Sequence, residues 1–251
     1  MELSGQVAVI TGGSRGIGRG IALSMAAAGA DIVINYRKDE NAAAETAKAV
    51  NDLGRRSALA PGDVSDWESA GRVIKKAFDA FGRIDILVNN AGIASRGNIV
   101  DKIDPIEWNR VMMTNLYSVF NCSKSVLPYM HQAKKGVIIN ITSIAAQTLA
   151  AASAPYSIAK AGVDAFTKVL AREEGPKGIR VNAIGPGIVK TEMGDRLMKA
   201  WGEEVVKSRL QATPLRRIAY PEDIGNVAVF LASEKASYIT GKIFHLDGGI
   251  L

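Results

Sequence analysis

The sequence predicts a doubly wound α/β fold, in which helices cover both faces of a parallel sheet of about seven strands. Two observations predict it. Short, uniformly apolar runs alternate with longer helical stretches along all 251 residues, and strands of that composition are typical of a sheet that is buried on both faces. No linker, internal repeat or low-complexity tract interrupts this alternation, so we expect one domain, 1–251.

The expected elements follow one another as strands separated by helical stretches. The expected strands are apolar runs bounded by turn residues: Val7–Ile10, Ile32–Ile34, Ser57–Ala60, Ile86–Val88, Val137–Ile141, Ile179–Ile184 and Ile243–Leu246. The clearest helical stretches are Ile21–Ala28, Glu107–Met130, Pro155–Glu174 and a helix that starts near Pro221. A helix between two strands supplies the crossover that parallel pairing requires.

A glycine-rich turn joins the first strand to the first helix. Thr11–Gly18 contains glycine, three residues, glycine, one residue and glycine, a spacing that departs from the G-x-G-x-x-G fingerprint. Glycines let the backbone approach a pyrophosphate, and the free amides at a helix N-terminus bind it. The turn therefore indicates a Rossmann-like dinucleotide site, with an ordinary tight connection between strand and helix as the alternative.

The residues after the second strand indicate which dinucleotide is bound. The strand ends in Tyr36 and Arg37, where a fold selective for NAD usually has an Asp or Glu that holds the ribose 2′-hydroxyl. Arg37 and Arg15 instead offer guanidinium groups that suit the 2′-phosphate of NADP. The sequence therefore predicts NADP(H), with two solvated surface arginines as the alternative.

Ser143, Tyr156 and Lys160 indicate proton transfer to a carbonyl oxygen. Tyr156 and Lys160 lie four residues apart in the expected helix Pro155–Glu174, so they share one of its faces. A tyrosine hydroxyl titrates near ~10, and a neighbouring ammonium lowers that pKa. Ser143 follows the strand Val137–Ile141, where its hydroxyl would polarise the same oxygen. Capping of local backbone is the alternative for this hydroxyl.

These motifs resemble those of the short-chain dehydrogenase/reductase family, and the resemblance extends over essentially the whole chain. Besides Ser143, Tyr156 and Lys160, the residues that carry the resemblance are Thr11–Gly18, Asp63, Val64, Asn89, Asn90, Ala91, Gly92, Pro186, Gly187 and Thr191. The resemblance implies that hydride passes between a nicotinamide and a substrate carbonyl carbon, with Tyr156 as the proton donor.

The resemblance also implies which residues form the site. The catalytic tetrad of the family corresponds to Asn115, Ser143, Tyr156 and Lys160. Lys160 would bind the nicotinamide ribose, and Asn115 would help to hold a water molecule; a buried asparagine that satisfies local backbone is the alternative. The cofactor-binding residues that it implies are Gly12, Ser14, Arg15, Gly16, Ile17, Gly18, Tyr36, Arg37, Asp63, Val64, Asn89, Ala91, Gly92, Tyr156, Lys160, Pro186, Gly187, Ile188 and Thr191.

The segment 190–213 looks like a mobile lid over the substrate. Among its charges it carries the apolar residues Met193, Leu197, Met198, Trp201 and Leu210. Ordinary helical core packing would use the same residues. We expect a small-walled, mostly apolar substrate pocket, formed by Ala94, Ser143, Ala145, Ala146, Gln147, Tyr156, Ile188, Met193 and Leu197.

Within the family, the pattern is most similar to the 3-oxoacyl-carrier-protein reductases, which reduce a β-ketoacyl thioester with NADPH. Lys134 and Lys177 fall where such enzymes carry basic residues that face the acidic carrier. The alternatives are an NADP-dependent reductase of free ketones, aldehydes, sugars or diketones, and a non-catalytic dinucleotide-sensing scaffold. The family further implies a homotetramer that pairs the helices Glu107–Met130 and Pro155–Glu174.

Composition argues against several other classes of protein. The formal charge of +6 comes from 31 basic and 25 acidic residues that are dispersed along the chain, so we expect no nucleic-acid partner. No apolar run reaches about 18 residues, which favours a cytoplasmic protein without a membrane segment. Cys122 is the only cysteine, so no internal disulfide can form. His131 and His245 lack metal-ligand spacing, so we expect no metal.

Overall fold

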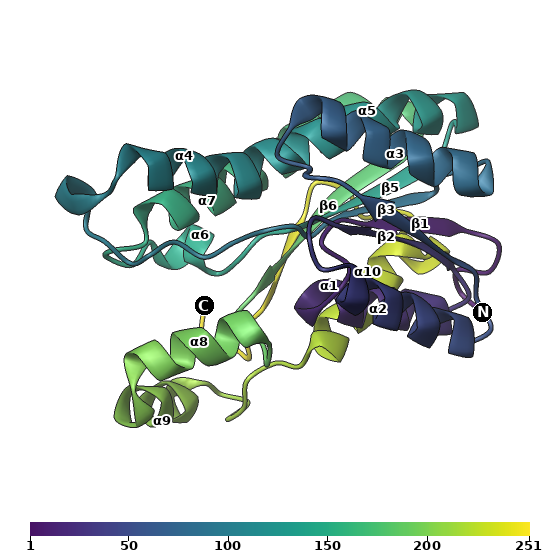
Figure 1. The fold of residues 1–251 in the computed structure, drawn as a ribbon. Coiled ribbons are helices and arrows are strands. Elements are labelled where there is room, and N and C mark those ends of the chain that lie inside the picture. The colour runs from purple at the N-terminus through teal and green to yellow at the C-terminus, as the bar shows by residue number, and fades with distance from the viewer.

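A parallel sheet forms the centre of the protein in the computed structural model, which describes residues 1–251 (Figure 1). Its strands are β1 (Val7–Ile10), β2 (Asp31–Tyr36), β3 (Ser57–Pro61), β4 (Ile86–Asn89), β5 (Gly136–Ile141), β6 (Ile179–Pro186) and β7 (Ile243–Leu246). They form one 7-stranded sheet in the order β3-β2-β1-β4-β5-β6-β7. Every expected strand is present, so the predicted doubly wound α/β fold is confirmed.

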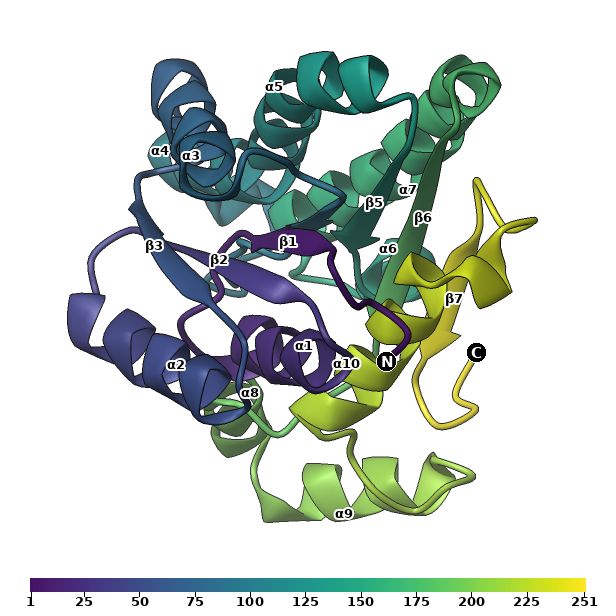
Figure 2. The ribbon, with the colours of Figure 1, turned by 90° about the vertical axis from the view of Figure 1, so that its right-hand side faces the viewer.

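Helices cover both faces of this sheet (Figure 2). They are α1 (Gly16–Ala27), α2 (Glu40–Asp52), α3 (Trp67–Phe81), α4 (Pro105–Met112), α5 (Ser118–Ala133), α6 (Ala145–Thr148), α7 (Ala154–Glu174), α8 (Glu192–Trp201), α9 (Glu203–Ala212) and α10 (Pro221–Ala232). Short helical turns are η1 (Val100–Lys102), η2 (Met113–Tyr117), η3 (Gly175–Lys177) and η4 (Glu234–Ala236). Helices α1, α2 and α10 pack on one face, and α3, α5 and α7 pack on the other.

Most strand positions are apolar because both faces of the sheet are buried. In β1, Ala8 and Ile10 belong to the hydrophobic cluster beneath α1, α2 and α10, whereas Val7 and Val9 belong to the cluster beneath α3, α5 and α7. Burial of a valine or isoleucine side chain contributes about 1.5–3 kcal/mol. The alternation of side chains along each strand therefore builds two cores from one sheet.

The chain reverses its direction across the sheet between β3 and β4. Because β1 pairs with both β2 and β4, the turns that follow β1 and β4 lie next to each other at the carboxyl edge of the sheet. Thr11 links them, since its Oγ1 accepts hydrogen bonds from the backbone N–H groups of Asn90 (2.9 Å) and Ala91 (3.0 Å). The Asn90 side chain donates in return to the carbonyl oxygens of Thr11 and Gly12.

The expected helix Glu107–Met130 is not continuous. Helices α4 and α5 are joined by η2, a π-helical turn that contains Asn115. The Asn115 side-chain amide donates to the Val111 carbonyl oxygen at 3.0 Å, an acceptor that a regular α-helix would offer to the Asn115 backbone N–H. This competition explains the wider turn, and π-helical turns are frequent at functional sites.

The structure bears on three expectations drawn from composition, about membrane segments, metal sites and the single cysteine. No helix has the combination of length and apolarity needed to cross a membrane. No group of three or more His, Cys, Asp or Glu side chains could hold a metal ion; His131 pairs with Glu174, and His245 is exposed. Burial of Cys122 raises the pKa of its thiol to about 12, which leaves it unreactive.

Candidate active site

The four residues of the expected catalytic tetrad come together beyond the carboxyl ends of β4 and β5. Ser143 follows β5, Tyr156 and Lys160 lie in the first turns of α7, and Asn115 lies in η2. The end of β5 fixes α7 in place, because the Lys160 Nζ donates to the Ile141 carbonyl oxygen at 2.7 Å and Thr142 Oγ1 donates to the Lys160 carbonyl oxygen at 3.1 Å.

Tyr156 is suited to donate a proton. Burial of the phenol raises its pKa, and a hydrogen bond with the Ser143 side chain lowers it only in part, so the pKa stays above its ordinary value. The expected lowering by Lys160 is wrong for this structure. The ammonium lies 5.8 Å from the centroid of the Tyr156 ring and is directed at Ile141 instead. Tyr156 is therefore protonated at neutral pH, as a general acid must be.

Lys160 is a buried cation, with 4% of its surface exposed. Burial lowers the pKa of its ammonium to about 8, and the negative charge of Asp164 opposes that shift. At neutral pH Lys160 is thus still mostly charged, although its pKa of about 8 is not far above neutral pH. A small rise in pH or the loss of a neighbouring negative charge would deprotonate it.

Asn115 and Gly92 close the other side of the cluster. Asn115 is fully buried, accepts from the Ile93 N–H and donates to the Ile93 carbonyl oxygen, both at 3.0 Å. A Cβ atom placed on Gly92 would lie 2.7 Å from Asn115 Oδ1 and 3.7 Å from Lys160 Nζ. The Gly92 backbone therefore fills the space between these two side chains.

The turn after β1 forms a cradle that fits a pyrophosphate. Helix α1 begins with no side-chain cap and no acidic residue in its first turn, so its free amides and positive dipole end are available to an anion. Gly12 and Gly16 have positive φ values of 60° and 54°, which favour glycine. At Gly18, a Cβ atom would lie 2.2 Å from the Gly12 carbonyl oxygen, so only glycine lets α1 pack this closely.

Comparison with known proteins agrees with this arrangement of cradle and proton donor. A family model described as "Enoyl-(Acyl carrier protein) reductase" matches residues 12–251. A 3-oxoacyl-(acyl-carrier-protein) reductase FabG from Vibrio cholerae is 41% identical over 250 residues, which is 100% of this chain and 99% of that protein. The chain belongs to the short-chain dehydrogenase/reductase family. It is an oxidoreductase that acts on CH–OH and C=O groups with a nicotinamide dinucleotide.

Other members of the short-chain dehydrogenase/reductase family support the same assignment. A 3-oxoacyl-(acyl-carrier-protein) reductase from Synechocystis is 39% identical and covers 99% of this chain and 98% of its own. The crystal structure of levodione reductase superimposes with a TM-score of 0.95 at 31% identity, covering 98% of each chain. A short-chain dehydrogenase/reductase variant from Serratia marcescens gives 0.92 at 32% identity, with 100% and 99% covered.

Both arginines that the sequence indicated for the 2′-phosphate form ion pairs at the surface. Arg37 Nη1 lies 3.3 Å from Asp63 Oδ2, and Arg15 Nη1 lies 3.1 Å from Glu192 Oε2 in α8. Exposed pairs of this kind contribute about 0–1 kcal/mol, so little free energy is lost when either guanidinium leaves its carboxylate. Tyr36, which directly precedes Arg37, is buried, and burial together with Glu40 raises its pKa.

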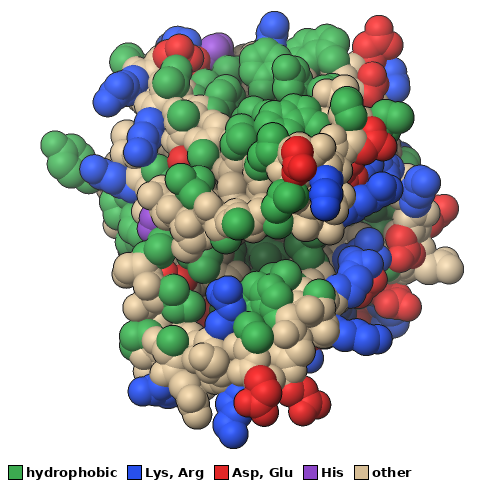
Figure 3. Space-filling view, turned by 90° about the vertical axis from the view of Figure 1, so that its left-hand side faces the viewer, with side chains coloured by type: hydrophobic (Ala, Val, Ile, Leu, Met, Phe, Trp, Pro, Cys, Tyr) green, Lys and Arg blue, Asp and Glu red, His purple; other side chains and the backbone are tan.

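The segment 190–213 forms two helices, α8 and α9, below the catalytic cluster (Figure 1). Figure 3 shows a hollow at mid-height on this side of the molecule, with hydrophobic side chains around it. Met193 and Leu197 of α8 are exposed, and whether they contact substrate stays a prediction. The same holds for the other expected pocket residues, among which Ala94 is exposed and Gln147 donates to Asp164 at 3.4 Å.

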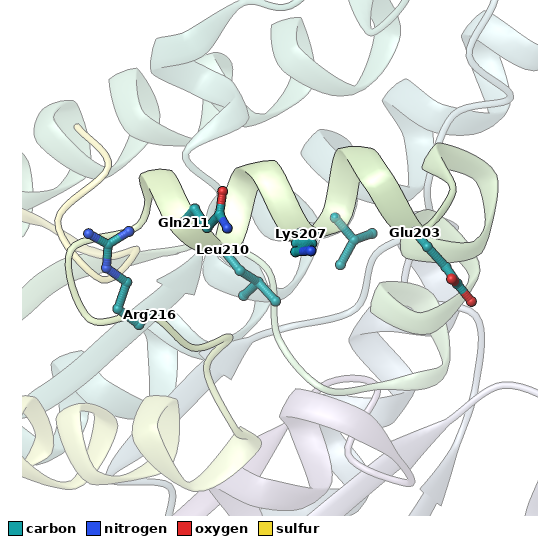
Figure 4. Close-up of a pocket in the computed structure, with 6 residues that line it drawn as sticks. Glu203, Lys207, Leu210, Gln211 and Arg216 are labelled. Atoms are coloured by element: carbon teal, nitrogen blue, oxygen red, sulfur yellow. The ribbon is translucent and has the colours of Figure 1, made fainter.

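A separate pocket of about 380 Å³ lies along α9 (Figure 4). Val206 and Leu210 form its apolar part, and Lys207 and Arg216 are among its charged residues. It contains none of the catalytic residues. Leu210 therefore lies in a different pocket from the catalytic cluster, and Trp201 stacks its ring with Arg209, whose guanidinium carbon is 4.1 Å from the ring centroid.

Sequence reasoning missed residues that act on the site through others. Thr142 bonds the backbone of Lys160, Glu192 pairs with Arg15, and Asp164 is buried one turn beyond Lys160. Only Asp164 gives a signal in the sequence, because a carboxylate four residues after a lysine lies on the same face of a helix. The Arg15–Glu192 pair joins residues 177 positions apart, so no local pattern could reveal it.

Proposed function

We propose that this protein reduces the 3-oxo group of an acyl thioester carried on an acyl carrier protein, with NADPH as reductant. The observation that carries the proposal is the 41% identity, over the whole chain, to a relative named for this reaction. The cluster of Ser143, Tyr156 and Lys160 supports it, because it holds a protonated phenol, a hydroxyl and a cation where a carbonyl oxygen can be protonated.

In the proposed reaction, the bound nicotinamide dinucleotide supplies the hydride that the carbonyl carbon receives. Tyr156 donates the proton to the carbonyl oxygen, and its raised pKa keeps that proton in place at neutral pH. Ser143 donates a hydrogen bond to the same oxygen and so stabilises its developing negative charge. The positive charge of Lys160 stabilises the phenolate that Tyr156 becomes.

Arg15 and Arg37 support NADPH as the cofactor. Arg15 lies in the glycine turn and Arg37 directly follows β2, and the carboxylates that now pair with them are exposed and weakly held. A 2′-phosphate offers two negative charges and a geometry that matches a guanidinium fork. The glycine cradle, Asp63, Val64 and the segment from Pro186 to Thr191 would hold the rest of the dinucleotide.

A basic surface at the end of α7 opposite the catalytic cluster is the candidate docking surface for a carrier. A Cβ atom on Gly178 would lie 2.6 Å from the Lys134 carbonyl oxygen, so Lys134 and Lys177 belong to one surface. Lys177 Nζ donates to the buried Glu174 at 2.8 Å, whereas Lys134 is in no ion pair. Most of the free positive charge therefore belongs to Lys134.

A substrate panel assayed with NADPH tests the proposed function. It compares a 3-oxoacyl-carrier thioester, an enoyl-carrier thioester, a cyclic diketone and a simple ketone. Preference for the 3-oxoacyl-carrier thioester supports the proposal. Preference for the diketone would instead favour a free carbonyl reductase, in line with the similarity to levodione reductase. Turnover of the enoyl thioester alone would contradict it, although the matching family model carries that name.

The role of Tyr156 is tested by Tyr156→Phe, which removes the hydroxyl and leaves the ring. We expect kcat to fall by about 10²- to 10⁴-fold, the usual effect of losing a general acid, while the Kd for NADPH stays unchanged. Tyr129→Phe is the matched control, because Tyr129 stacks on Phe78 with ring centroids 4.5 Å apart, and the variant preserves that contact. A Tyr156→Phe enzyme that retained more than about a tenth of kcat would contradict the assignment.

Carrier docking is tested by charge reversal on the basic surface. We expect Lys134→Glu to raise the KM for the carrier thioester more than Lys177→Glu does, since Lys177 is already offset by Glu174. Neither change should alter the KM for a small ketone. Lys48→Glu, in α2 on the other face of the sheet, is the control. Equal effects on both substrates would contradict docking at this surface.

We further propose that the protein is a homotetramer built on η2, α5 and α7. These elements expose the large apolar side chains of Met113, Tyr117, Phe120, Ile158 and Val169, and burial of such side chains against a second copy stabilises an interface. Sedimentation equilibrium that showed only monomer at micromolar concentration would contradict this. A cytoplasmic location stays a prediction.

A further inference from the structure

Helix α7 carries a buried carboxylate that the proposed reaction does not use. Asp164 is 6% exposed, and its Oδ1 has no hydrogen-bond partner. Its Oδ2 accepts only a long bond, at 3.4 Å, from Gln147 Nε2. A buried carboxylate usually has several partners, because its removal from water is costly. Local hydrogen bonding therefore does not account for the burial of this carboxylate.

Its position one turn beyond Lys160 suggests the reason. Residues four apart on a helix lie on the same face, so Lys160 and Asp164 carry opposite charges on one buried face of α7, close enough for Asp164 to act on the Lys160 ammonium without a direct ion pair. The other groups around Lys160 are uncharged at neutral pH: Tyr156 of α7, Asn115 of η2, Ile141 at the end of β5 and Thr142 after it. Gln147 of α6, which faces Asp164, is uncharged as well.

We propose that Asp164 is a positioning residue, whose negative charge keeps the ammonium of Lys160 protonated while its carboxylate holds Gln147 beside the substrate site. The proposal rests on the proposed catalytic role of Lys160. Burial lowers the pKa of Lys160 to about 8 even though the negative charge of Asp164 opposes that shift. An opposite charge within about 4–6 Å raises the pKa of a cation by about 1–3 units. Without Asp164, Lys160 would lose its proton within the neutral range.

The first test measures the pKa of Lys160 directly in the free protein. The ε-carbon resonances of labelled lysines are followed by NMR as pH is changed, and Lys160→Met identifies the Lys160 signal. Asp164→Asn keeps the shape of the side chain and an acceptor for Gln147 but removes the charge. We expect the pKa of Lys160 to fall by about one unit or more. Asp164→Ser, which is also neutral, serves the same purpose if the asparagine variant does not fold.

Glu174→Gln is the matched control. Glu174 is also a buried carboxylate of α7, at 4% exposure, and it is bound by His131 and Lys177. It lies roughly 20 Å further along the helix than Lys160, at 1.5 Å per residue. The Glu174→Gln change should therefore leave the pKa of Lys160 where it is. Asp164→Glu retains the negative charge, so the pKa of Lys160 should stay close to its value in the unmutated protein.

The second test is the pH dependence of kcat with a carbonyl substrate. Activity should fall as Lys160 is deprotonated, so the alkaline limb of the profile should move to lower pH in Asp164→Asn. Below the pKa of Lys160 in both proteins, kcat should agree within about a factor of two, since Lys160 is then charged in each. A merely structural role for Asp164 would lower kcat at every pH and leave the limb in place.

The two tests separate this proposal from the proposed function. If the unmutated protein reduces no carbonyl compound, the proposed function fails, and the NMR titration still decides whether Asp164 sets the charge of Lys160. If Asp164→Asn leaves both the pKa of Lys160 and the alkaline limb of an active enzyme unchanged, the role of Asp164 is overturned. A shift in Asp164→Asn that Glu174→Gln reproduces would overturn it equally.

Discussion

Gly92→Ala adds a methyl group where the structure has no space for one. The new Cβ atom would lie 2.7 Å from Asn115 Oδ1, a separation below 3.0 Å that real Cβ atoms essentially never show. Asn115 cannot retreat easily, because it is fully buried and makes three hydrogen bonds of 3.0 Å, to the Ile93 N–H, the Ile93 carbonyl and the Val111 carbonyl. Relief of the clash must therefore break some of these bonds or move the loop after β4.

The cost follows from these contacts. Overpacking of a filled interior costs about 1–3 kcal/mol, and each broken hydrogen bond adds about 1 kcal/mol. We expect the free energy of unfolding to fall by about 2–4 kcal/mol in total. For a chain of 251 residues, each kcal/mol lowers Tm by roughly 2–4 °C, so Tm should fall by roughly 5–15 °C. NADPH binding should weaken too, because the added Cβ atom would lie 3.7 Å from the Lys160 Nζ, which is expected to bind the nicotinamide ribose.

Thermal unfolding followed by circular dichroism measures the first effect, and fluorescence titration with NADPH measures the second. Gly71→Ala is the matched control, because a Cβ atom at this position of α3 meets nothing within 4 Å. Alanine is favoured over glycine in a helix by about 0.5–1 kcal/mol, so this control should keep or raise Tm. A Gly92→Ala protein with the Tm of the unmutated protein would refute the packing argument.

Further predictions concern the cofactor and the end of α10. Tyr36→Asp combined with Arg37→Ile should shift the preference in kcat/KM from NADPH towards NADH; equal values for both cofactors in the unmutated enzyme would contradict NADP selectivity. Glu192→Gln releases Arg15 from its ion pair and should lower the Kd for NADPH by up to about 5-fold at low salt, but not that for NADH; weaker NADPH binding would oppose this. Arg180→Met removes guanidinium bonds to the carbonyl oxygens of Leu231 in α10 and Ser233 just after it and should lower the unfolding free energy by about 2–4 kcal/mol, which urea denaturation would test.

The sequence predicted what depends on local pattern. Each strand is a short run of apolar residues, and both faces of the sheet are buried, so composition alone located β1 at Val7–Ile10 and β7 at Ile243–Leu246 without error. The helix that contains Tyr156 and Lys160 was predicted to within one residue, since Pro155 favours its start. Spacing indicated Ser143, Tyr156 and Lys160, and the family resemblance added Asn115; the structure brings these four residues together.

What the sequence could not predict depends on contacts between distant segments. The π-helical turn at 113–117 arises because the Asn115 side chain bonds both Val111 and a loop 22 positions earlier, and a periodic pattern gives no sign of it. The pKa of Tyr156 was expected to be lowered by Lys160, but it is raised by burial. Burial is a property of the whole fold, and the Lys160 ammonium bonds a strand carbonyl that no motif includes.

The link between Thr11 and Asn90 has a consequence for the order in which the protein can fold. The two residues are 79 positions apart, so on the ribosome β1 has only β2 to pair with, and β2 has β3 on its other side, until β4 is released. During that interval one edge of β1 is open, and an unpaired strand edge invites misassociation. The dinucleotide cannot help at this stage, because a ligand stabilises only a state that already contains its site. Added cofactor should therefore rescue variants that weaken the completed fold and should fail to rescue those that impair the early assembly of β1, β2 and β3.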